Sequence, residues 1–279
     1  RELQPDSRSN AELLAEALQV ANQADVIVAT LGEASEMSGE SSSRTNIEIP
    51  QVQKDLLAAL LKTGKPVVLV LFTGRPLALT WEQKNVPAIL NVWFGGSEAG
   101  DAIADVLFGD VNPSGKLTTS FPQNVGQVPI YYAHKNTGRP LGEGKWFEKF
   151  RSNYLDVSND PLYPFGYGLS YTTFSYSDVK LSSASLKGNQ TLTASVTVTN
   201  TGTRDGKETV QLYIRDLVGS ITRPVKELKG FQKISLKAGE SKTVTFSITP
   251  NDLKFYNGDL KYDWEPGEFS IMIGASSAE

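Results

Sequence analysis

The sequence predicts an α/β domain built around a mostly parallel sheet, followed by an all-β sandwich. Three observations support this prediction. Apolar strands alternate with amphipathic helices in the first part of the chain, a connector rich in aromatic, glycine and proline residues follows, and alternating apolar and polar residues fill the rest. We therefore expect three regions along the chain, at residues 1–122, 123–174 and 175–279.

The first region opens with a helix that leads into a strand. Apolar residues recur at three- and four-residue spacing between Asn10 and Ala24, and Asn10 is available as the N-cap. Residues 25–31 then form a continuous apolar stretch, which is typical of a parallel strand buried on both faces. We expect this pair to be the first unit of an α/β sheet.

The same pattern recurs twice along the chain. Pro50 can occupy the first turn of a second helix, which Gly64 ends before a strand at residues 66–71. A third strand at residues 88–94 is followed by two glycines and a helix at residues 97–108. Strands that alternate with helices at these intervals indicate βαβ units around a parallel sheet.

The connector at residues 123–174 has no regular alternation and is rich in proline, glycine, tyrosine and asparagine. A segment of this kind is either an ordered functional loop or a linker. Its many aromatic residues favour an ordered structure, because flexible linkers rarely carry so much apolar surface.

The last region has the period-two pattern of half-buried strands. Leu192, Ala194, Val196 and Val198 alternate with serine and threonine, and further short runs follow, separated by turn signals. About seven short strands of this kind fit an immunoglobulin-like or fibronectin type III sandwich.

Composition restricts the class of protein. The chain has 279 residues, 39% of them hydrophobic, which predicts two soluble domains that each bury a core. The net charge of -4, with scattered lysines and arginines, argues against a nucleic-acid partner. There is no cysteine, so disulfides and thiolate metal sites are excluded. No apolar run approaches the ~20 residues that a membrane-spanning helix needs, so no membrane partner is expected.

The loops that follow the strands are the places to search for a site, because ligands of open α/β sheets bind beyond the carboxyl ends of the strands. The loop at residues 32–44 is long and polar and holds three glutamates and an arginine. A general acid needs a carboxyl whose pKa is raised by burial or by a neighbouring negative charge. One of these glutamates can meet that need once a partner surface covers the loop; the alternative is a solvated loop.

Three further side chains are candidates. Arg75 follows the second strand and either binds an anion or bridges strand and helix. Trp93 ends the third strand and either stacks on a sugar face or packs in a core. His134 is the single histidine, and one histidine cannot build a multi-histidine metal site, so no metal is expected. The sequence has no Gly-x-Ser-x-Gly elbow and no Gly-x-Gly-x-x-Gly after the first strand, which argues against a serine hydrolase and against dinucleotide binding.

An ordered series of motifs resembles the C-terminal portion of glycoside hydrolase family 3, especially its bacterial periplasmic β-glucosidases. The segments are ADVIV (24–28), GE (32–33), ESSSR (40–44), GKPVVLV (64–70), GRP (74–76), WFGGSEAG (93–100), NPSGKL (112–117) and LYPFGYGLSY (162–171). The resemblance implies that residues 1–122 are the C-terminal part of the family's second domain, an α/β sandwich, and that the enzyme is periplasmic or secreted.

The resemblance also implies a retaining exo-β-glycosidase that hydrolyses terminal non-reducing β-D-glucosyl residues. An aspartate nucleophile on an N-terminal (β/α)8 barrel attacks the anomeric carbon, and a glutamate of this chain protonates the leaving oxygen. Glu40, which precedes Ser-Ser-Ser-Arg, resembles this acid/base residue, and Glu33 is the second choice. Glu33, Arg44, Trp93 and His134 are the expected substrate-binding residues, although Arg44 can equally orient the carboxylate or pack against the barrel.

The resemblance places the barrel and its nucleophile outside residues 1–279, so we expect no turnover by this chain alone. The expected partners are a β-glucoside or oligosaccharide substrate and the barrel, and no cofactor is implied. The oligomeric state is left open, a homodimer included. The alternative is a non-catalytic carbohydrate-binding or structural module.

Overall fold

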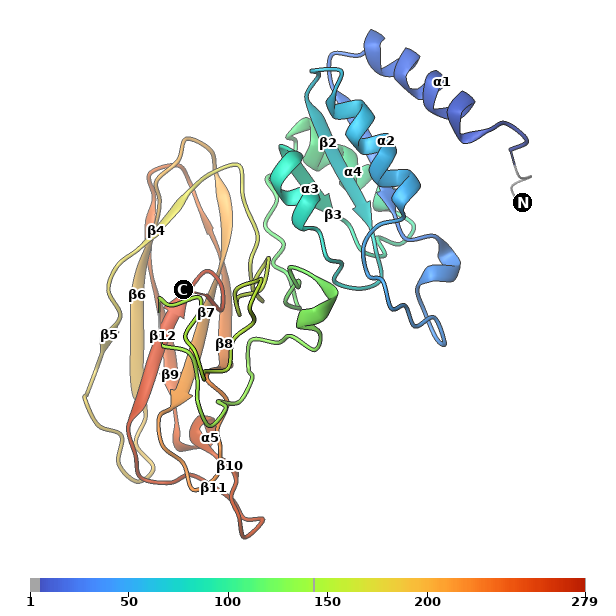
Figure 1. Cartoon of the computed structure of the whole chain (residues 1–279). Helices are drawn as coiled ribbons and strands as arrows, with labels where there is room; N and C mark the ends of the chain where they lie inside the picture. The colour runs from blue at the N-terminus through green and yellow to red at the C-terminus, as the bar shows by residue number, and fades with distance from the viewer. Residues whose placement is uncertain (1–5, 143, 279) are drawn as a thin grey trace. The chain divides into compact units, whose positions relative to one another are not determined.

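The computed structural model describes residues 6–142 and 144–278 of the chain. They form two compact units, one made of residues 6–103 and 122–128 and the other of residues 104–121, 129–142 and 144–278 (Figure 1). Each unit is discontinuous along the sequence. The boundaries that we predict at residues 122 and 174 divide the chain into consecutive regions, and they stay predictions.

The first unit is built on a parallel sheet, as the alternating pattern predicts. Its strands are β1 (Ile27–Gly32), β2 (Val67–Phe72) and β3 (Ala88–Asn91), in the order β1-β2-β3. Val28 of β1 lies opposite Val68 of β2, which also lies opposite Ala88 of β3. The central strand is apolar throughout, which suits its position between two other strands. Val67, Leu69, Val70 and Leu71 of this strand are buried.

The prediction that the first strand is buried on both faces is wrong. Burial alternates along β1, so that Val28 is 47% exposed and Thr30 is exposed as well. β1 is an edge strand in the described part of the sheet, and no described helix covers this face of it. The apolar residues of this segment therefore predict a strand correctly. They do not predict its burial, because burial depends on which other elements pack against the strand.

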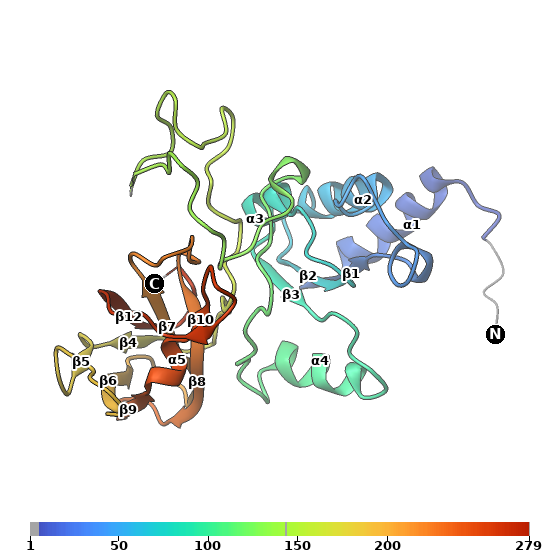
Figure 2. The ribbon, with the colours of Figure 1, turned by 90° about the horizontal axis from the view of Figure 1, so that it is seen from below.

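Helices α1 (Asn10–Gln23), α2 (Gln51–Leu61) and α3 (Thr80–Asn85) lie on one side of this sheet (Figure 2), and α2 contacts both β1 and α1. Helix α4 continues across the boundary between the two units. None of the described helices is long and apolar enough to cross a membrane. The helical segments of this part of the chain are α1 (Asn10–Gln23), the 3-10 turn η1 (Ser35–Met37), α2 (Gln51–Leu61), α3 (Thr80–Asn85), α4 (Ala99–Phe108) and the 3-10 turn η2 (Val125–Gln127).

The helix starts differ from the predicted ones. Ser9, and not Asn10, caps α1: its hydroxyl accepts from the Glu12 backbone N–H, and the Glu12 carboxylate accepts from the Ser9 backbone N–H. This reciprocal capping box requires an acidic residue three positions after the cap, which Asn10 lacks. Pro50 stands at the N-cap position of α2, one residue before its first turn.

The described residues of the second unit form two larger antiparallel sheets, which confirm the predicted sandwich, and a two-stranded antiparallel ribbon of β10 and β11. One sheet has the order β12-β7-β8, and the other has the order β4-β6-β5, with β9 also paired to β6. The elements are β4 (Phe174–Tyr176), β5 (Lys180–Leu181), β6 (Leu192–Asn200), β7 (Gly206–Asp216), β8 (Glu227–Leu236), β9 (Ser241–Ile248), α5 (Pro250–Leu253), β10 (Phe255–Tyr256), β11 (Tyr262–Asp263) and β12 (Phe269–Gly274).

Residues that alternate along β6 form the centre of the sandwich core. Every second side chain of this strand, beginning at Leu192, is buried, and these side chains pack against apolar side chains of β7, β8, β9 and β12. The intervening threonines and serines are partly exposed. The period-two pattern therefore predicts the inward face of β6 correctly.

Most of the aromatic connector, from Pro129 onward, belongs to the second unit. The Leu117 N–H donates to the Tyr167 carbonyl over 2.8 Å, and the Phe121 N–H donates to the Tyr163 carbonyl over 2.9 Å. The Tyr163 and Tyr167 rings stack with their centroids 5.3 Å apart. Main-chain hydrogen bonds and ring stacking thus hold the two ends of this segment beside each other.

Replacement of Asn200 by alanine should destabilise the sandwich by about 2–4 kcal/mol, because buried polar groups lose their partners. Asn200 is 0% exposed; its Oδ1 accepts from Thr172 Oγ1 and the Gly202 N–H, and its Nδ2 donates to the Arg204 and Leu236 carbonyls. The measurement is amide exchange of β6 in increasing denaturant. Asn189→Ala, at an exposed loop position, is the control, and equal stability of the two variants would contradict the prediction.

Candidate functional site

The carboxyl ends of the parallel strands lie close together, and a glycine makes this possible. A side chain at Gly32 would place its Cβ 1.8 Å from the Phe72 carbonyl oxygen, and Gly32 has a φ of +143° that other residues rarely adopt. The Gln53 side-chain amide, from α2, both donates to the Gly32 carbonyl and accepts from its N–H. The next residue, Glu33, is thereby fixed at the edge of the sheet, with its N–H donating to the Phe72 carbonyl over 2.9 Å.

The Glu33 carboxylate is the centre of the loops that follow β1 and β2. Its side chain is 1% exposed. Oε1 lies 2.8 Å from Arg44 Nη1 and 2.8 Å from Arg75 Nε, the latter an ion-pair contact whose angle does not suit a hydrogen bond. Oε2 accepts from Thr73 Oγ1 over 3.0 Å and from the Gly74 N–H over 3.1 Å. Two cations and two neutral donors therefore surround one buried carboxylate.

These contacts determine the charge of Glu33. Burial by itself would raise the pKa of this carboxyl, but the hydrogen bonds from Arg44, Gly74 and Thr73 and the charge of Arg75 together hold the pKa below its ordinary value. Glu33 is thus ionised at neutral pH and has no proton to donate. A group of this kind suits a structural or orienting role and not that of a general acid.

Glu40 lies at the tip of a tight turn in the same loop. The Ser42 N–H donates to the Gly39 carbonyl over 3.3 Å, and Ser41 has a φ of +60°, so residues 39–42 have the features of a type II turn. Glu40 occupies the second position of this turn and is exposed. Its carboxylate therefore extends from the loop towards solvent.

Two arginines hold the loop in shape. Arg75 Nη2 donates to the Met37 carbonyl and, over 2.9 Å, to the Ser42 carbonyl, which lie on either side of Glu40. Arg44 Nη2 donates to the Glu48 carbonyl over 2.9 Å, near the end of the loop. Both guanidinium groups also contact Glu33, so a single carboxylate organises the whole loop.

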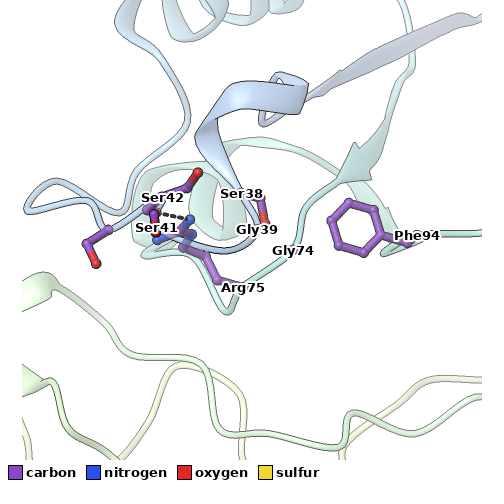
Figure 3. Close-up of a pocket in the computed structure, with 8 residues that line it drawn as sticks. Ser38, Gly39, Ser41, Ser42, Gly74, Arg75 and Phe94 are labelled. Atoms are coloured by element: carbon purple, nitrogen blue, oxygen red, sulfur yellow. Dashed lines mark hydrogen bonds between the residues drawn. The ribbon is translucent and has the colours of Figure 1, made fainter.

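A polar pocket of about 420 Å³ lies beside the turn. Figure 3 shows the Phe94 ring on one side of it and Ser41, Ser42 and Arg75 on the other. Glu40 is not a lining residue, although its neighbours on both sides are. The lining residues are Ser38, Gly39, Ser41, Ser42, Ser43, Gly74, Arg75 and Phe94.

Trp93 and Phe94, which follow β3, differ in burial: Trp93 is partly buried and Phe94 is exposed. Trp93 has a φ of +50°, which is unusual for a bulky residue, and it lines a second pocket of about 330 Å³ together with Glu33. The neighbouring Phe94 is 77% exposed and lines both pockets. Phe94 is therefore the most exposed aromatic residue among those that line the two pockets, and it was not among the predicted site residues.

The loops after β2 and β3 contact the loop after β1 without room for a further methyl group. A Cβ at Gly74 would lie 1.8 Å from Ser38 Oγ and 2.7 Å from Phe94 Cζ. A glycine that directly follows a strand end, before an arginine and a proline, is a sequence signal of such close approach. It points to Arg75 as a site residue, a role that the sequence left undecided.

The first unit thus brings together Glu33, Arg44, Trp93 and the turn that carries Glu40. His134 belongs to the second unit, where its carbonyl accepts from the Val225 N–H over 2.9 Å. Within residues 6–142 and 144–278, no three side chains of histidine, aspartate or glutamate gather as a metal-binding group. An exposed carboxylate beside a polar pocket can exchange a proton with a ligand that covers it.

Two family models match the chain. Residues 5–171 match the glycosyl hydrolase family 3 C-terminal domain, and residues 208–277 match the fibronectin type III-like domain. The first match contains the complete constellation around Glu33 and the Glu40 turn.

Individual proteins are similar over nearly the whole chain. A periplasmic β-glucosidase of Salmonella typhimurium is 58% identical over 273 residues, which are 98% of this chain and 36% of that protein. A β-xylosidase of Formosa agariphila is 48% identical over 94% of this chain and 35% of its own length. The crystal structure of a Listeria innocua β-glucosidase in complex with glucose superposes with a TM-score of 0.88 at 43% identity, covering 98% of this chain and 37% of that one. The chain spans about a third of the length of these relatives.

Proposed function

Because this chain belongs to glycosyl hydrolase family 3, whose C-terminal domain it carries, we propose that it is part of a retaining exo-β-glycosidase. The proposed substrate is a terminal non-reducing β-D-glucosyl residue. The names of the relatives, β-glucosidase and β-xylosidase, support a β-linked pyranoside substrate. The proposed partner is an N-terminal (β/α)8 barrel, which supplies the aspartate nucleophile.

The position of Glu40 is the observation that carries this proposal. In a retaining glycosidase two carboxyl groups lie ~5–5.5 Å apart across the scissile bond. A carboxylate that acts with a nucleophile from another domain must extend from its own domain, and Glu40 does so from the tip of its turn. Glu33 is buried and ionised, so it is the weaker candidate for the acid.

In the proposed mechanism Glu40 serves twice. In the first step its carboxyl gives a proton to the leaving oxygen while the aspartate forms a covalent bond to the anomeric carbon. In the second step the Glu40 carboxylate removes a proton from water, which displaces the aspartate and restores the anomeric configuration.

The remaining site residues have supporting roles in the proposal. Arg44 orients the loop through Glu33, and the Phe94 ring offers an apolar face to the leaving group. Trp93 and His134 remain proposed substrate contacts. We further propose a periplasmic or secreted protein, since the Salmonella relative is called periplasmic, and we propose no cofactor.

Hydrolysis of 4-nitrophenyl β-glucoside tests the proposal. This chain alone should show no rate above background, because no residue in it acts as the nucleophile. The chain joined to the proposed barrel should hydrolyse the substrate and release β-glucose first, as proton NMR of the anomeric signal would show. A 4-nitrophenyl β-xyloside distinguishes the two activities named for the relatives.

Two outcomes would contradict the proposed function. Turnover by this chain alone would place the nucleophile within its own residues. Glycan binding without turnover by the longer protein would support the alternative of a non-catalytic carbohydrate-binding module.

A further inference from the structure

The guanidinium of Arg75 makes two contacts that flank the Glu40 turn and a third with Glu33. Nη2 donates to the carbonyls of Met37 and Ser42, while Nε contacts Glu33 Oε1 at 2.8 Å. Met37 and Ser42 are the residues at which the chain enters and leaves the segment that contains Glu40. One planar group thus fixes both ends of this segment relative to β2.

The turn has weak support of its own. Its backbone hydrogen bond, from the Ser42 N–H to the Gly39 carbonyl, is 3.3 Å long, and the Ser42 hydroxyl reaches the Glu40 carbonyl at 3.5 Å. Serine and glycine side chains contribute little apolar burial, so packing cannot compensate for weak hydrogen bonds. The conformation of the turn therefore depends on a donor outside it, the guanidinium of Arg75.

Arg75 is itself held firmly at the end of β2. Its N–H donates to Thr73 Oγ1 over 3.1 Å, and the single proton of that hydroxyl is shared between the Arg75 carbonyl and Glu33 Oε2. Pro76 follows it and restricts its backbone, and the next residue, Leu77, is fully buried. The backbone that carries the guanidinium is thus fixed close to the end of β2.

We propose that Arg75 is a positioning residue for the glycosidase reaction, which fixes the Glu40 carboxyl by clamping the Met37 and Ser42 carbonyls on both sides of it. This rests on the proposed role of Glu40. Arg44 differs, since its second contact is the Glu48 carbonyl, beyond the turn. A misplacement of about 1 Å can reduce catalysis by about a hundredfold, so the clamp has a kinetic effect without touching substrate.

The effect should depend on the leaving group. A sugar or alkyl alcohol leaves only with a proton from the acid, whereas 2,4-dinitrophenolate leaves without one. Arg75→Met should therefore reduce kcat/KM by about 10- to 100-fold for cellobiose but by no more than about threefold for glycosylation by 2,4-dinitrophenyl β-glucoside. General damage to the fold would reduce both rates equally.

The kinetic test uses the barrel-bearing protein with Arg75→Met, Arg75→Lys and a control, Lys54→Met. Lys54 forms a 2.8 Å ion pair with Glu48 and is as buried as Arg75, but it does not contact residues 37–42. The control should match the unsubstituted protein, and lysine should restore only part of the cellobiose rate, because it lacks the planar fork. If Arg75→Met fails to fold, the double variant Glu33→Gln/Arg75→Met is measured in its place. In this variant the buried Glu33 carboxylate, which would otherwise lack its Arg75 partner, is replaced by a neutral amide.

Amide exchange of this chain provides the second measurement. Arg75→Met should speed exchange in residues 38–43 by about tenfold or more and leave β2 unchanged, since local opening requires only loss of the clamp. Unchanged exchange with equal losses for both substrates would overturn the proposal. Full cellobiose activity of Glu40→Ala would instead refute the role of Glu40, so the two failures are distinguishable.

Discussion

Replacement of Glu40 by alanine should reduce kcat/KM for 4-nitrophenyl β-glucoside by about 10²- to 10⁴-fold in the barrel-bearing protein, because a positioned acid/base contributes that much. Azide should restore part of the rate for activated substrates and yield β-glucosyl azide. Azide needs no general base and is small enough to fill the space that the carboxylate leaves. Rates with and without azide, together with NMR of the product, check this result.

Glu36 provides the matched control for this substitution. It lies in the same loop, is exposed, and accepts a hydrogen bond only locally from Ser35 Oγ over 2.8 Å. Glu36→Ala should keep full activity without azide. Full activity of Glu40→Ala, or azide stimulation of both variants, would remove Glu40 from the proposed mechanism.

Replacement of Glu33 by alanine should destabilise the first unit by about 3–5 kcal/mol, the usual effect of removing one partner from a buried ion pair. Arg44 and Arg75 would then be partly buried without their shared carboxylate. Thr73 Oγ1 and the Gly74 N–H would lose an acceptor as well. Urea unfolding of this chain, followed by exchange of β2 amides, measures the loss.

The same group predicts how stability depends on pH. The pKa of Glu33 lies below its ordinary 4.5 in the folded chain, so the unfolded chain binds the proton more readily. The contribution of Glu33 is therefore complete above pH 4.5 and is lost as the pH falls through the folded pKa. The stability difference between the unsubstituted chain and Glu33→Gln should shrink over this range. A difference that stayed constant down to pH 3 would show that Glu33 titrates normally, within the usual ~1 unit spread of carboxyl pKa values.

The sequence predicts the sheet well because the information is local. The strand from Val67 to Phe72 is apolar throughout, and the alternation of strands with helices predicts a parallel sheet, which the pairing of β2 with β1 and β3 confirms. The same local information fails at Val28, whose exposure depends on what covers the sheet. Local information also fails to predict the N-cap of α1. Ser9 is the cap in place of Asn10 because Ser9 and Glu12 form reciprocal hydrogen bonds.

The site was predicted only in part because its contacts join distant residues. Arg75 meets Met37 and Ser42, which lie 38 and 33 positions earlier, so no pattern around Arg75 reveals them. Phe94 is exposed because Trp93 adopts a left-handed backbone conformation, which no propensity predicts for tryptophan. The choice between Glu40 and Glu33 likewise required the burial and partners of both carboxyls, and the roles of both stay proposals.

The close contact around Gly74 also limits how the site can move. Its backbone touches Ser38 of one loop and Phe94 of another, so neither loop can slide past it without first separating from the sheet. A lid that opens and closes needs a hinge and free space, and at Gly74 not even one added methyl group fits between the three loops. We therefore expect the three loops to shift together around Gly74, and not as separate lids.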